Sequence, residues 1–227
     1  SVHGDTSPTM AQPLEGLGDL CREAGAYYYV DATATIGGME IASDRWGVDV
    51  VTAGLQKCLG GPSGSAPITV SDRAAEYIFS RRHVEKGIVR DDIADGSGTR
   101  IGSNYFDLAM IMDYWSEKRL NHHTEATSML YCARECARVA LDEGLETRFQ
   151  RHTKAGAAMT AGVRALGLKV FGTDETRMTN VTGIYIPDGI AGERVRQRML
   201  QDFEIEIGTA FGPLQGKIWR IGAMGYN

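Results

Sequence analysis

Two residues with side chains suited to catalysis each follow an apolar segment of the chain. Asp31 comes directly after residues 27–30, and Lys57 lies 26 residues further on, just past the apolar residues 48–52. A lysine amine can condense with an aldehyde, and a carboxylate can hold a proton on a ring nitrogen. Pyridoxal phosphate chemistry needs this pair, because the protonated ring accepts electrons. The two residues together therefore indicate a chemical role.

Each of the two residues also has an ordinary structural explanation. An aspartate after a strand often caps a helix or forms a turn, and a lysine in a loop is usually solvated. In open α/β sheets, however, ligands bind beyond the carboxyl ends of the strands, which is where both residues are expected. We therefore expect Asp31 and Lys57 to reach one ligand.

Composition limits the classes of function. The chain has 227 residues, of which 43% are hydrophobic and 23% charged, which suffices for one large core or two modest ones. The formal net charge of -5 argues against a nucleic-acid partner and favours small neutral or anionic metabolites. No apolar run approaches the roughly 20 residues that a membrane helix needs. The chain begins with Ser1 and stops just after an expected strand, so we expect an interior segment of a longer polypeptide.

The cysteines and histidines do not indicate a metal site. The chain has four cysteines and no CxxC pair, which fits a reducing compartment and a cytoplasmic location. Cys132 and Cys136 share a predicted helix face, where core packing is the commoner role. His122 and His123 are adjacent, so on an extended segment they point to opposite faces. The glycine-rich residues 60–64 lack the Gly-Lys-Ser/Thr ending of a P-loop, which disfavours a nucleotide kinase.

Hydrophobic periodicity predicts alternating helices and strands, then a change of pattern. The first part has expected strands at residues 27–30, 48–52 and 66–70 and expected helices at 13–23 and 71–81. Buried strands separated by helices predict a mainly parallel sheet. Further helices are expected at 105–118, 124–143 and 146–166. Beyond Gly167, short strands at 169–171, 181–186, 205–207 and 217–221, with a helix at 193–203, predict a smaller α+β domain.

Four short motifs, taken together, resemble the class V aminotransferases of the pyridoxal phosphate fold type I. They are Val30-Asp31-Ala32-Thr33, Gly54-Leu55-Gln56-Lys57, Asn121-His122-His123-Thr124 and Trp219-Arg220-Ile221-Gly222. The resemblance runs through essentially the whole chain. It implies an α/β fold with a mainly parallel large-domain sheet, whose N-terminal part would precede Ser1, and a smaller α+β C-terminal domain. We expect residues 1–123 to belong to the large domain, 124–145 to form a connecting helix and 146–227 to form the incomplete small domain.

The resemblance also implies roles for individual residues. Lys57 is similar to the lysine that binds pyridoxal phosphate covalently, and Asp31 to the partner of the pyridine nitrogen. Thr33 matches the position that packs on the ring face, and Thr6 the one that hydrogen-bonds the phenolic oxygen of the cofactor. Gln56 corresponds to a phosphate contact.

Three further residues carry expectations about substrates and partners. Thr124 corresponds to a phosphate contact that the other subunit of a homodimer donates. Arg220 lies among apolar neighbours, where it could serve a salt bridge or a substrate carboxylate; the resemblance favours the carboxylate. Asn121 is commonly tyrosine in alanine-glyoxylate enzymes. An amide offers both a donor and an acceptor, as a ureido group requires, so we expect (S)-ureidoglycine as amino donor and glyoxylate as acceptor.

Several alternatives stay open. The long polar segment 91–103 is longer than in alanine-specific relatives and is expected to help shape the donor pocket. An alanine- or serine-glyoxylate aminotransferase is the nearest alternative. A cysteine desulfurase is disfavoured, because such enzymes commonly carry histidine where Gln56 stands. A cofactor-free α/β binding module would have had to retain Asp31, Lys57 and Arg220 without using them.

Overall fold

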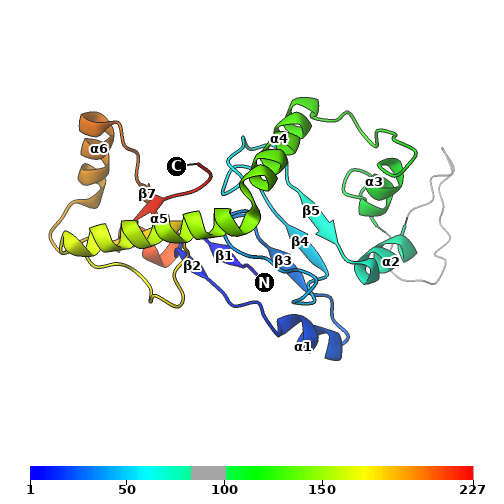
Figure 1. Ribbon diagram of the computed structural model, residues 1–227, viewed down its shortest axis with the longest axis horizontal. Helices are drawn as coiled ribbons and strands as arrows, with labels where there is room; N and C mark the ends of the chain where they lie inside the picture. Colours follow the sequence, from blue (N-terminus) through cyan, green and yellow to red (C-terminus); the bar gives the residue numbers. More distant parts are fainter. Residues whose placement is uncertain (83–100, 227) are drawn as a thin grey trace.

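The computed structural model describes residues 1–82 and 101–226, and Figure 1 shows their arrangement. A three-stranded sheet contains β3 (Tyr29–Asp31), β4 (Val50–Thr52) and β5 (Ile68–Val70) in that order. A second three-stranded sheet contains β6 (Val181–Tyr185), β8 (Ile218–Gly222) and β7 (Gly208–Thr209). The long helix α5 (Leu145–Ala165) runs in front of the second sheet in Figure 1. Within the described residues, no helix has the length and apolarity to cross a membrane.

The first sheet confirms the expected strands but not all of their directions. Strand β3 runs parallel to β4, and Asp31 is the register partner of Thr52. Strand β5 instead runs antiparallel to β4. Parallel neighbours need a crossover connection, usually a helix. The segment between β4 and β5 forms tight turns instead, with Gly60 and Gly64 at positive φ, so the chain returns in the opposite direction.

The core of this region lies beside β3 and β4. Its buried members are Leu14, Tyr28, Val30, Ala32, Val48 and Val51. Helix α1 (Leu17–Glu23) packs against it through Leu17 and Cys21. The sequence predicted a start at residue 13, but Gly16 has a left-handed φ of 81°, so the helix begins only at Leu17. The carboxyl ends of β3 and β4 are therefore held on a packed layer.

The other helices of this half agree with the predicted ranges only in part. Helix α2 (Asp72–Ser80) starts as expected, because Ser71 Oγ accepts a hydrogen bond from the backbone N–H of Ala74 at 3.2 Å. Helix α3 (Leu108–Tyr114) is shorter at both ends than the predicted 105–118; it starts late because the Asp107 carboxylate caps its first turn. Helix α4 (Thr127–Glu143) meets α5 at Gly144, whose φ is 83°.

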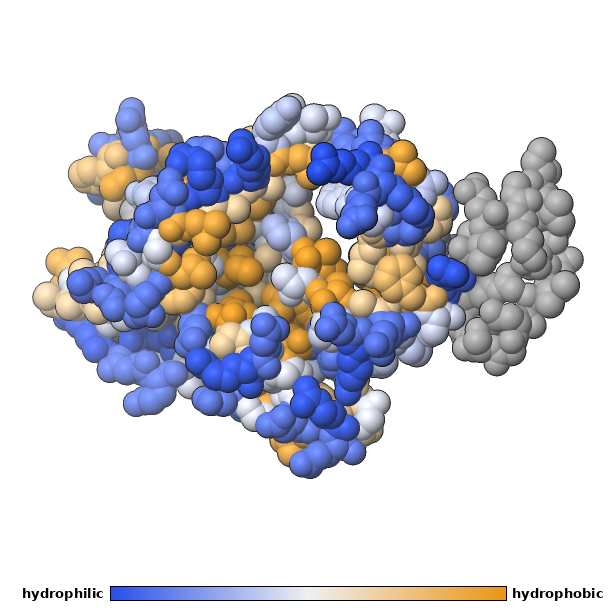
Figure 2. Space-filling view, turned by 45° about the vertical axis from the view of Figure 1, so that its right-hand side comes forward, coloured by the Kyte–Doolittle hydropathy of each residue, from blue (hydrophilic) through white to orange (hydrophobic). Residues whose placement is uncertain are grey.

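Helix α4 packs only part of its surface. A Cβ atom at Gly61 would lie 2.6 Å from Sγ of Cys136, so α4 sits close against the loop after β4. Tyr131 and Leu141 on the same helix remain 69% and 68% exposed. Figure 2 shows hydrophobic residues gathered at the centre of one face, bordered by hydrophilic ones. Exposed apolar surface of this kind is typical of an interaction site.

The second sheet is antiparallel throughout and covered by α5 and α6 (Gly192–Phe203). Its core contains Val163, Val170, Ile184, Ile207 and Trp219. The predicted strand at 205–207 was misplaced: Ile207 is buried in this core, and pairing begins at Gly208. The predicted strand at 169–171 is a single bridge between Val170 and Ile184. A short 3-10 helix, Gly212–Leu214, precedes β8.

The N-terminal residues connect the two sheets, which the sequence did not indicate. They form a small hairpin of β1 (Gly4–Asp5) and β2 (Met10–Ala11). On one side, Val2 bridges to Asp31 of the first sheet. On the other, Met10 bridges to Arg177 just before the second sheet. The hairpin therefore fixes the carboxyl end of β3 relative to the small sheet.

A close approach between α5 and the segment before β6 depends on Gly156. A Cβ atom there would lie 2.1 Å from the backbone oxygen of Thr179. We expect Gly156→Ala to lower the free energy of unfolding of the full-length protein by about 1–3 kcal/mol, as overpacking does. Gly162→Ala on the same helix is the control, because nothing lies within 4 Å of its Cβ position. Denaturant unfolding should show no loss for the control; equal stability of both variants would contradict the packing argument.

Candidate active site

Asp31 ends β3 and is held by several backbone hydrogen bonds. Its N–H donates to the carbonyl of Ser1 at 2.9 Å, and its carbonyl accepts from the N–H of His3 at 2.9 Å. The carboxylate Oδ1 accepts from the N–H of Thr33 at 2.8 Å. One carboxylate oxygen is thus used to orient the side chain, which stays half-buried. This leaves the other oxygen available to a ligand beyond the strand end.

Lys57 lies in the turn that follows β4, five residues after Thr52, the register partner of Asp31. The carbonyl of Leu55 accepts from the N–H of Gly61 at 2.8 Å, and that of Lys57 accepts from Gly60 at 3.0 Å. These bonds close the turn on itself. Leu55 and Cys58 are buried, whereas Lys57 is half-buried. Leu55 and Cys58 therefore anchor the turn in the protein interior, and Lys57 stays partly accessible.

Thr33 and Gln56 lie together around Gly54. A Cβ atom at Gly54 would lie 2.7 Å from Oε1 of Gln56 and 3.0 Å from Cγ2 of Thr33. The three residues line a pocket of about 350 Å³ together with Ala53, Gly64, Ser65 and Ala66. The lack of a side chain at residue 54 keeps the space between the threonine and the glutamine open. The pocket lies where the loops after β3 and β4 meet.

Thr6 and Arg220 meet on the side of the small sheet. Nη1 of Arg220 donates to the carbonyl of Thr6 at 2.5 Å, and the guanidinium lies 5.6 Å from the ring centre of Phe211. The Phe211 N–H donates to Oγ of Ser7 at 3.0 Å, which ties the same hairpin to this loop. Nε of Arg220 is buried and has no hydrogen-bond partner among the described residues. Burial lowers the pKa of Arg220, because removal from water disfavours the charged guanidinium.

The hairpin sets an upper limit on the distance between the two halves of this region. His3 is bonded to the backbone of Asp31, and Thr6 is bonded to Arg220. Because an extended chain advances at most about 3.5 Å per residue, the steps from His3 to Thr6 span no more than about 10 Å. The backbone of Asp31 and the guanidinium of Arg220 are therefore connected through two hydrogen bonds and one short stretch of chain.

Asn121 and Thr124 do not line the pocket of Thr33 and Gln56 in the described part of the chain. Both are exposed and lie in the segment between α3 and α4. Between them, Nδ1 of His122 and Nδ1 of His123 are 3.1 Å apart, and Nε2 of His123 lies 3.3 Å from Glu125. Within one chain, Asn121 and Thr124 are therefore exposed, whereas the two histidines between them are half-buried. The part of the expected donor-shaping loop at residues 91–100 lies outside the described residues.

Sequence reasoning missed two buried residues that support the turn around Lys57. Arg148 of α5 is fully buried and donates to the carbonyls of Gly37 at 2.9 Å and Cys58 at 2.6 Å. Asn180 is also fully buried and donates to the carbonyl of Ala34 at 2.6 Å and to Sγ of Cys58 at 2.7 Å. The acceptors are about 90–150 residues away in sequence, so no local motif could have indicated them.

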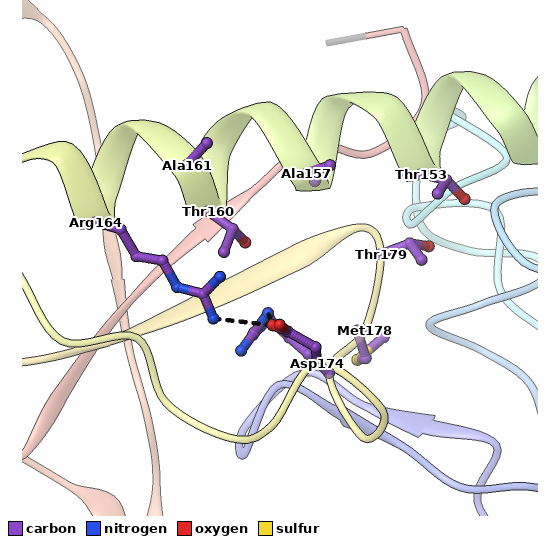
Figure 3. A pocket seen from close by; sticks show the side chains of 10 residues that line it. Thr153, Ala157, Thr160, Ala161, Arg164, Asp174, Met178 and Thr179 are labelled. Carbon is purple, nitrogen blue, oxygen red and sulfur yellow. Dashed lines mark hydrogen bonds and ion pairs between the residues drawn. The ribbon is translucent and has the colours of Figure 1, made fainter.

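A separate pocket of about 300 Å³ lies between α5 and residues 174–179 (Figure 3). Asp174 there accepts from Arg164 at 2.9 Å and from Arg177 at 2.6 Å. Figure 3 shows the guanidinium of Arg164 turned towards this carboxylate. None of the predicted site residues lines this pocket. The charges of Arg164, Asp174 and Arg177 in this pocket are paired with one another.

Comparison with known proteins identifies the family. The model of the family "Aminotransferase class-V" matches residues 3–209. The chain therefore belongs to the class V aminotransferases. It adopts the fold type I architecture of these enzymes, as the resemblance implied.

Particular relatives narrow the similarity further. The chain is 55% identical to the (S)-ureidoglycine–glyoxylate transaminase of Bacillus subtilis, over all of this chain and 55% of that protein. It is 34% identical to the alanine–glyoxylate aminotransferase of Rattus norvegicus, over all of this chain and 52% of that protein. A crystal structure of the ureidoglycine-glyoxylate aminotransferase from Bacillus subtilis superposes with a TM-score of 0.88 and 51% identity, covering 99% of this chain and 54% of that one. The chain thus spans about half the length of the curated relatives it matches.

Proposed function

We propose that the full-length protein is a pyridoxal phosphate-dependent aminotransferase that transfers the amino group of (S)-ureidoglycine to glyoxylate. The products are oxalurate and glycine. The observation that carries the proposal is the position of Asp31 and Lys57 at the carboxyl ends of two parallel, paired strands, beside the pocket lined by Thr33 and Gln56. The identity to the Bacillus subtilis transaminase supports the choice of substrates.

The residues around the pocket fit a flat ring that carries a phosphate. A ring next to Asp31 can pack against Thr33, since Gly54 leaves the neighbouring space open. Gln56 supplies an exposed amide at the same pocket for a phosphate oxygen. Thr6 is assigned to the phenolic oxygen. When bound, pyridoxal phosphate supplies an electron-accepting ring that delocalises the charge left on a deprotonated substrate carbon.

Lys57 and Asp31 have complementary roles in the proposal. The amine of Lys57 would hold the cofactor and, when free, would move a proton to and from the α-carbon of the amino donor. Asp31 would favour the protonated pyridine nitrogen through its remaining carboxylate oxygen. The hydrogen bond from Thr33 orients that carboxylate before the ligand arrives.

Arg220 is assigned to the substrate carboxylate. (S)-Ureidoglycine and glyoxylate both carry one carboxylate, so a single guanidinium can bind them in turn. The bond to the Thr6 carbonyl uses Nη1 and fixes the guanidinium plane, while Nε has no partner among the described residues. One arginine for two substrates predicts ping-pong kinetics, in which the donor product leaves before glyoxylate binds.

Asn121 and Thr124 are assigned to the active site of a second subunit. Both are exposed in the segment before α4, a helix that also exposes Tyr131 and Leu141. A homodimer that buried this face would carry Asn121 and Thr124 towards the site of its partner. Thr124 would then contact the phosphate, and Asn121 the ureido group of the donor.

An alanine- or serine-glyoxylate aminotransferase is the second candidate, favoured by the 34% identity to the rat enzyme. A panel of amino donors, each assayed with glyoxylate and including freshly prepared ureidoglycine, separates the two. The proposal requires the highest kcat/KM for ureidoglycine. If the full-length protein, incubated with pyridoxal phosphate, shows no visible absorbance from bound cofactor and transfers an amino group from no donor, a cofactor-free binding module is supported instead.

Replacing Asn121 with tyrosine tests the donor assignment. We expect the ratio of kcat/KM for ureidoglycine to kcat/KM for alanine to fall by about 10- to 100-fold, because the ureido group loses an amide partner. Asn121→Gln is the control: it keeps the amide and should retain more of the preference. An unchanged ratio in Asn121→Tyr would remove Asn121 from the specificity determinants.

A further inference from the structure

Two buried side chains connect the loop after Asp31 with the turn that carries Lys57. The loop contributes the carbonyls of Ala34 and Gly37 as acceptors. The turn contributes Cys58, the residue directly after the lysine. Arg148 donates to Gly37 and Cys58, and Asn180 donates to Ala34 and to Sγ of Cys58. The two donors come from different elements and bridge the same two segments. We infer that Arg148 and Asn180 are positioning residues, which set the place of Lys57 relative to Asp31 and thereby the rate at which the lysine captures the cofactor.

Arg148 is built to hold both segments at once. Its guanidinium is planar and rigid, so its three bonded nitrogens point in fixed directions. Nε and Nη2 serve the two carbonyls, and Nη1 pairs with Glu143 at 2.6 Å. Tyr226 covers the group, with its ring centre 4.9 Å from the guanidinium carbon. A change in either segment would leave a buried donor without its acceptor, which is costly, so the two segments are held at one separation.

Cys58 lets Asn180 act on the same point of the turn. The thiol is fully buried and lies 3.4 Å from the carbonyl of Ala34. Burial raises the pKa of this thiol, which keeps it protonated and able to donate to Ala34. The amide of Asn180 donates to the same sulfur and the same carbonyl. The three groups form a closed set of contacts one residue away from Lys57.

Arg151 provides a matched comparison for Arg148. It also bonds to Glu143, with Nε 2.6 Å from Oε1, and it also lies 4.9 Å from the ring centre of Tyr226. Together the two arginines lower the pKa of Glu143 to about 2, Arg151 contributing most. Removing Arg148 therefore leaves Glu143 paired with Arg151. The two arginines differ in burial and in the bonds to Gly37 and Cys58, which Arg148 alone donates.

The test compares Arg148→Met with Arg151→Met in the full-length protein. The inference rests on the proposed function, because it requires that Lys57 binds pyridoxal phosphate. The first measurement uses cofactor-free protein: pyridoxal phosphate is added, and the visible absorbance of the attached cofactor is followed in time. We expect the rate constant of capture to fall by about 10²-fold in Arg148→Met and to stay near the wild-type value in Arg151→Met, since a displacement of about 1 Å can cost that much. In the loaded enzyme, kcat should fall while the KM values for both substrates change little, because Arg220 lies on another segment.

Other variants keep the inference falsifiable. If Arg148→Met does not fold, as judged by circular dichroism, Arg148→Lys replaces it, since lysine keeps the charge beside Glu143 but cannot serve both carbonyls in the same way. Asn180→Ser should slow capture in the same direction by a smaller factor. Capture rates and kcat equal to those of Arg151→Met would overturn the inference. A wild-type protein that never captures pyridoxal phosphate would instead refute the proposed function.

Discussion

The Lys57→Ala variant should lose covalent attachment of pyridoxal phosphate and fall in turnover by about 10⁴-fold, because it lacks both the nucleophile that holds the cofactor and the base that moves the proton. Borohydride reduction followed by mass spectrometry checks the first effect. Reduced wild-type protein should carry the added mass of the cofactor on Lys57, and the variant should carry none. Donor-dependent formation of glycine from glyoxylate checks the second.

Lys154→Ala serves as the control for this experiment. Lys154 is an exposed lysine on α5, so its removal tests whether loss of any lysine lowers the cofactor content. The control should be labelled on Lys57 and turn over at the wild-type rate. If borohydride fixed the cofactor to the Lys57→Ala variant at another residue with turnover retained, Lys57 would not be the attachment site, and the central assignment would fail.

The sequence was sufficient to predict the two strands that precede Asp31 and Lys57. The apolar runs before each residue indicated strands, and β3 and β4 pair in parallel as expected. Asp31 ends β3, and Lys57 follows β4 in the next turn. Ligands in open α/β sheets bind beyond these carboxyl ends of the strands. Thr33 and Gln56 also share a pocket, although the sequence connected them only through the resemblance to class V aminotransferases.

The supporting contacts were beyond sequence reasoning, because they join residues that are distant along the chain. Arg148 occurs in a charged stretch of a predicted helix, where arginine is normally exposed. Its burial depends on acceptors at Gly37 and Cys58, which the fold brings to α5. The N-terminal hairpin was missed for a related reason: its strands have two residues each, too few for a periodic signal.

The direction of β5 and the place of β7 show a different limit. An apolar run predicts burial, but it does not say with which strand a segment pairs. Ile207 is buried as such a run suggests, yet the backbone pairing starts one residue later. The run before Ser71 forms β5, but its connection to β4 contains turns in place of a helix, so it pairs antiparallel. Hydrophobicity therefore predicted the core position of Ile207 but not that of β5, whose Ile68 is 41% exposed.

Asp31→Asn should bind pyridoxal phosphate but turn over about 10²- to 10³-fold more slowly, because a neutral amide does not stabilise the protonated pyridine nitrogen. The fold should tolerate the change: the amide oxygen of asparagine can still accept the N–H of Thr33, and the backbone bonds to Ser1 and His3 involve no side chain. Cofactor content is measured by visible absorbance, and turnover with ureidoglycine and glyoxylate.

Asp44→Asn is the matched control for this variant, since it makes the same change of charge at an exposed position outside the β3 and β4 strand ends. Both variants should unfold at similar temperatures, so that a difference in turnover reports on the ring nitrogen and not on stability. We expect Asp31→Asn to lower kcat, because the carboxylate stabilises charge that develops only after the substrate is bound. Turnover of Asp31→Asn equal to that of Asp44→Asn would show that the aspartate does not support the ring, and that its position at the end of β3 is structural.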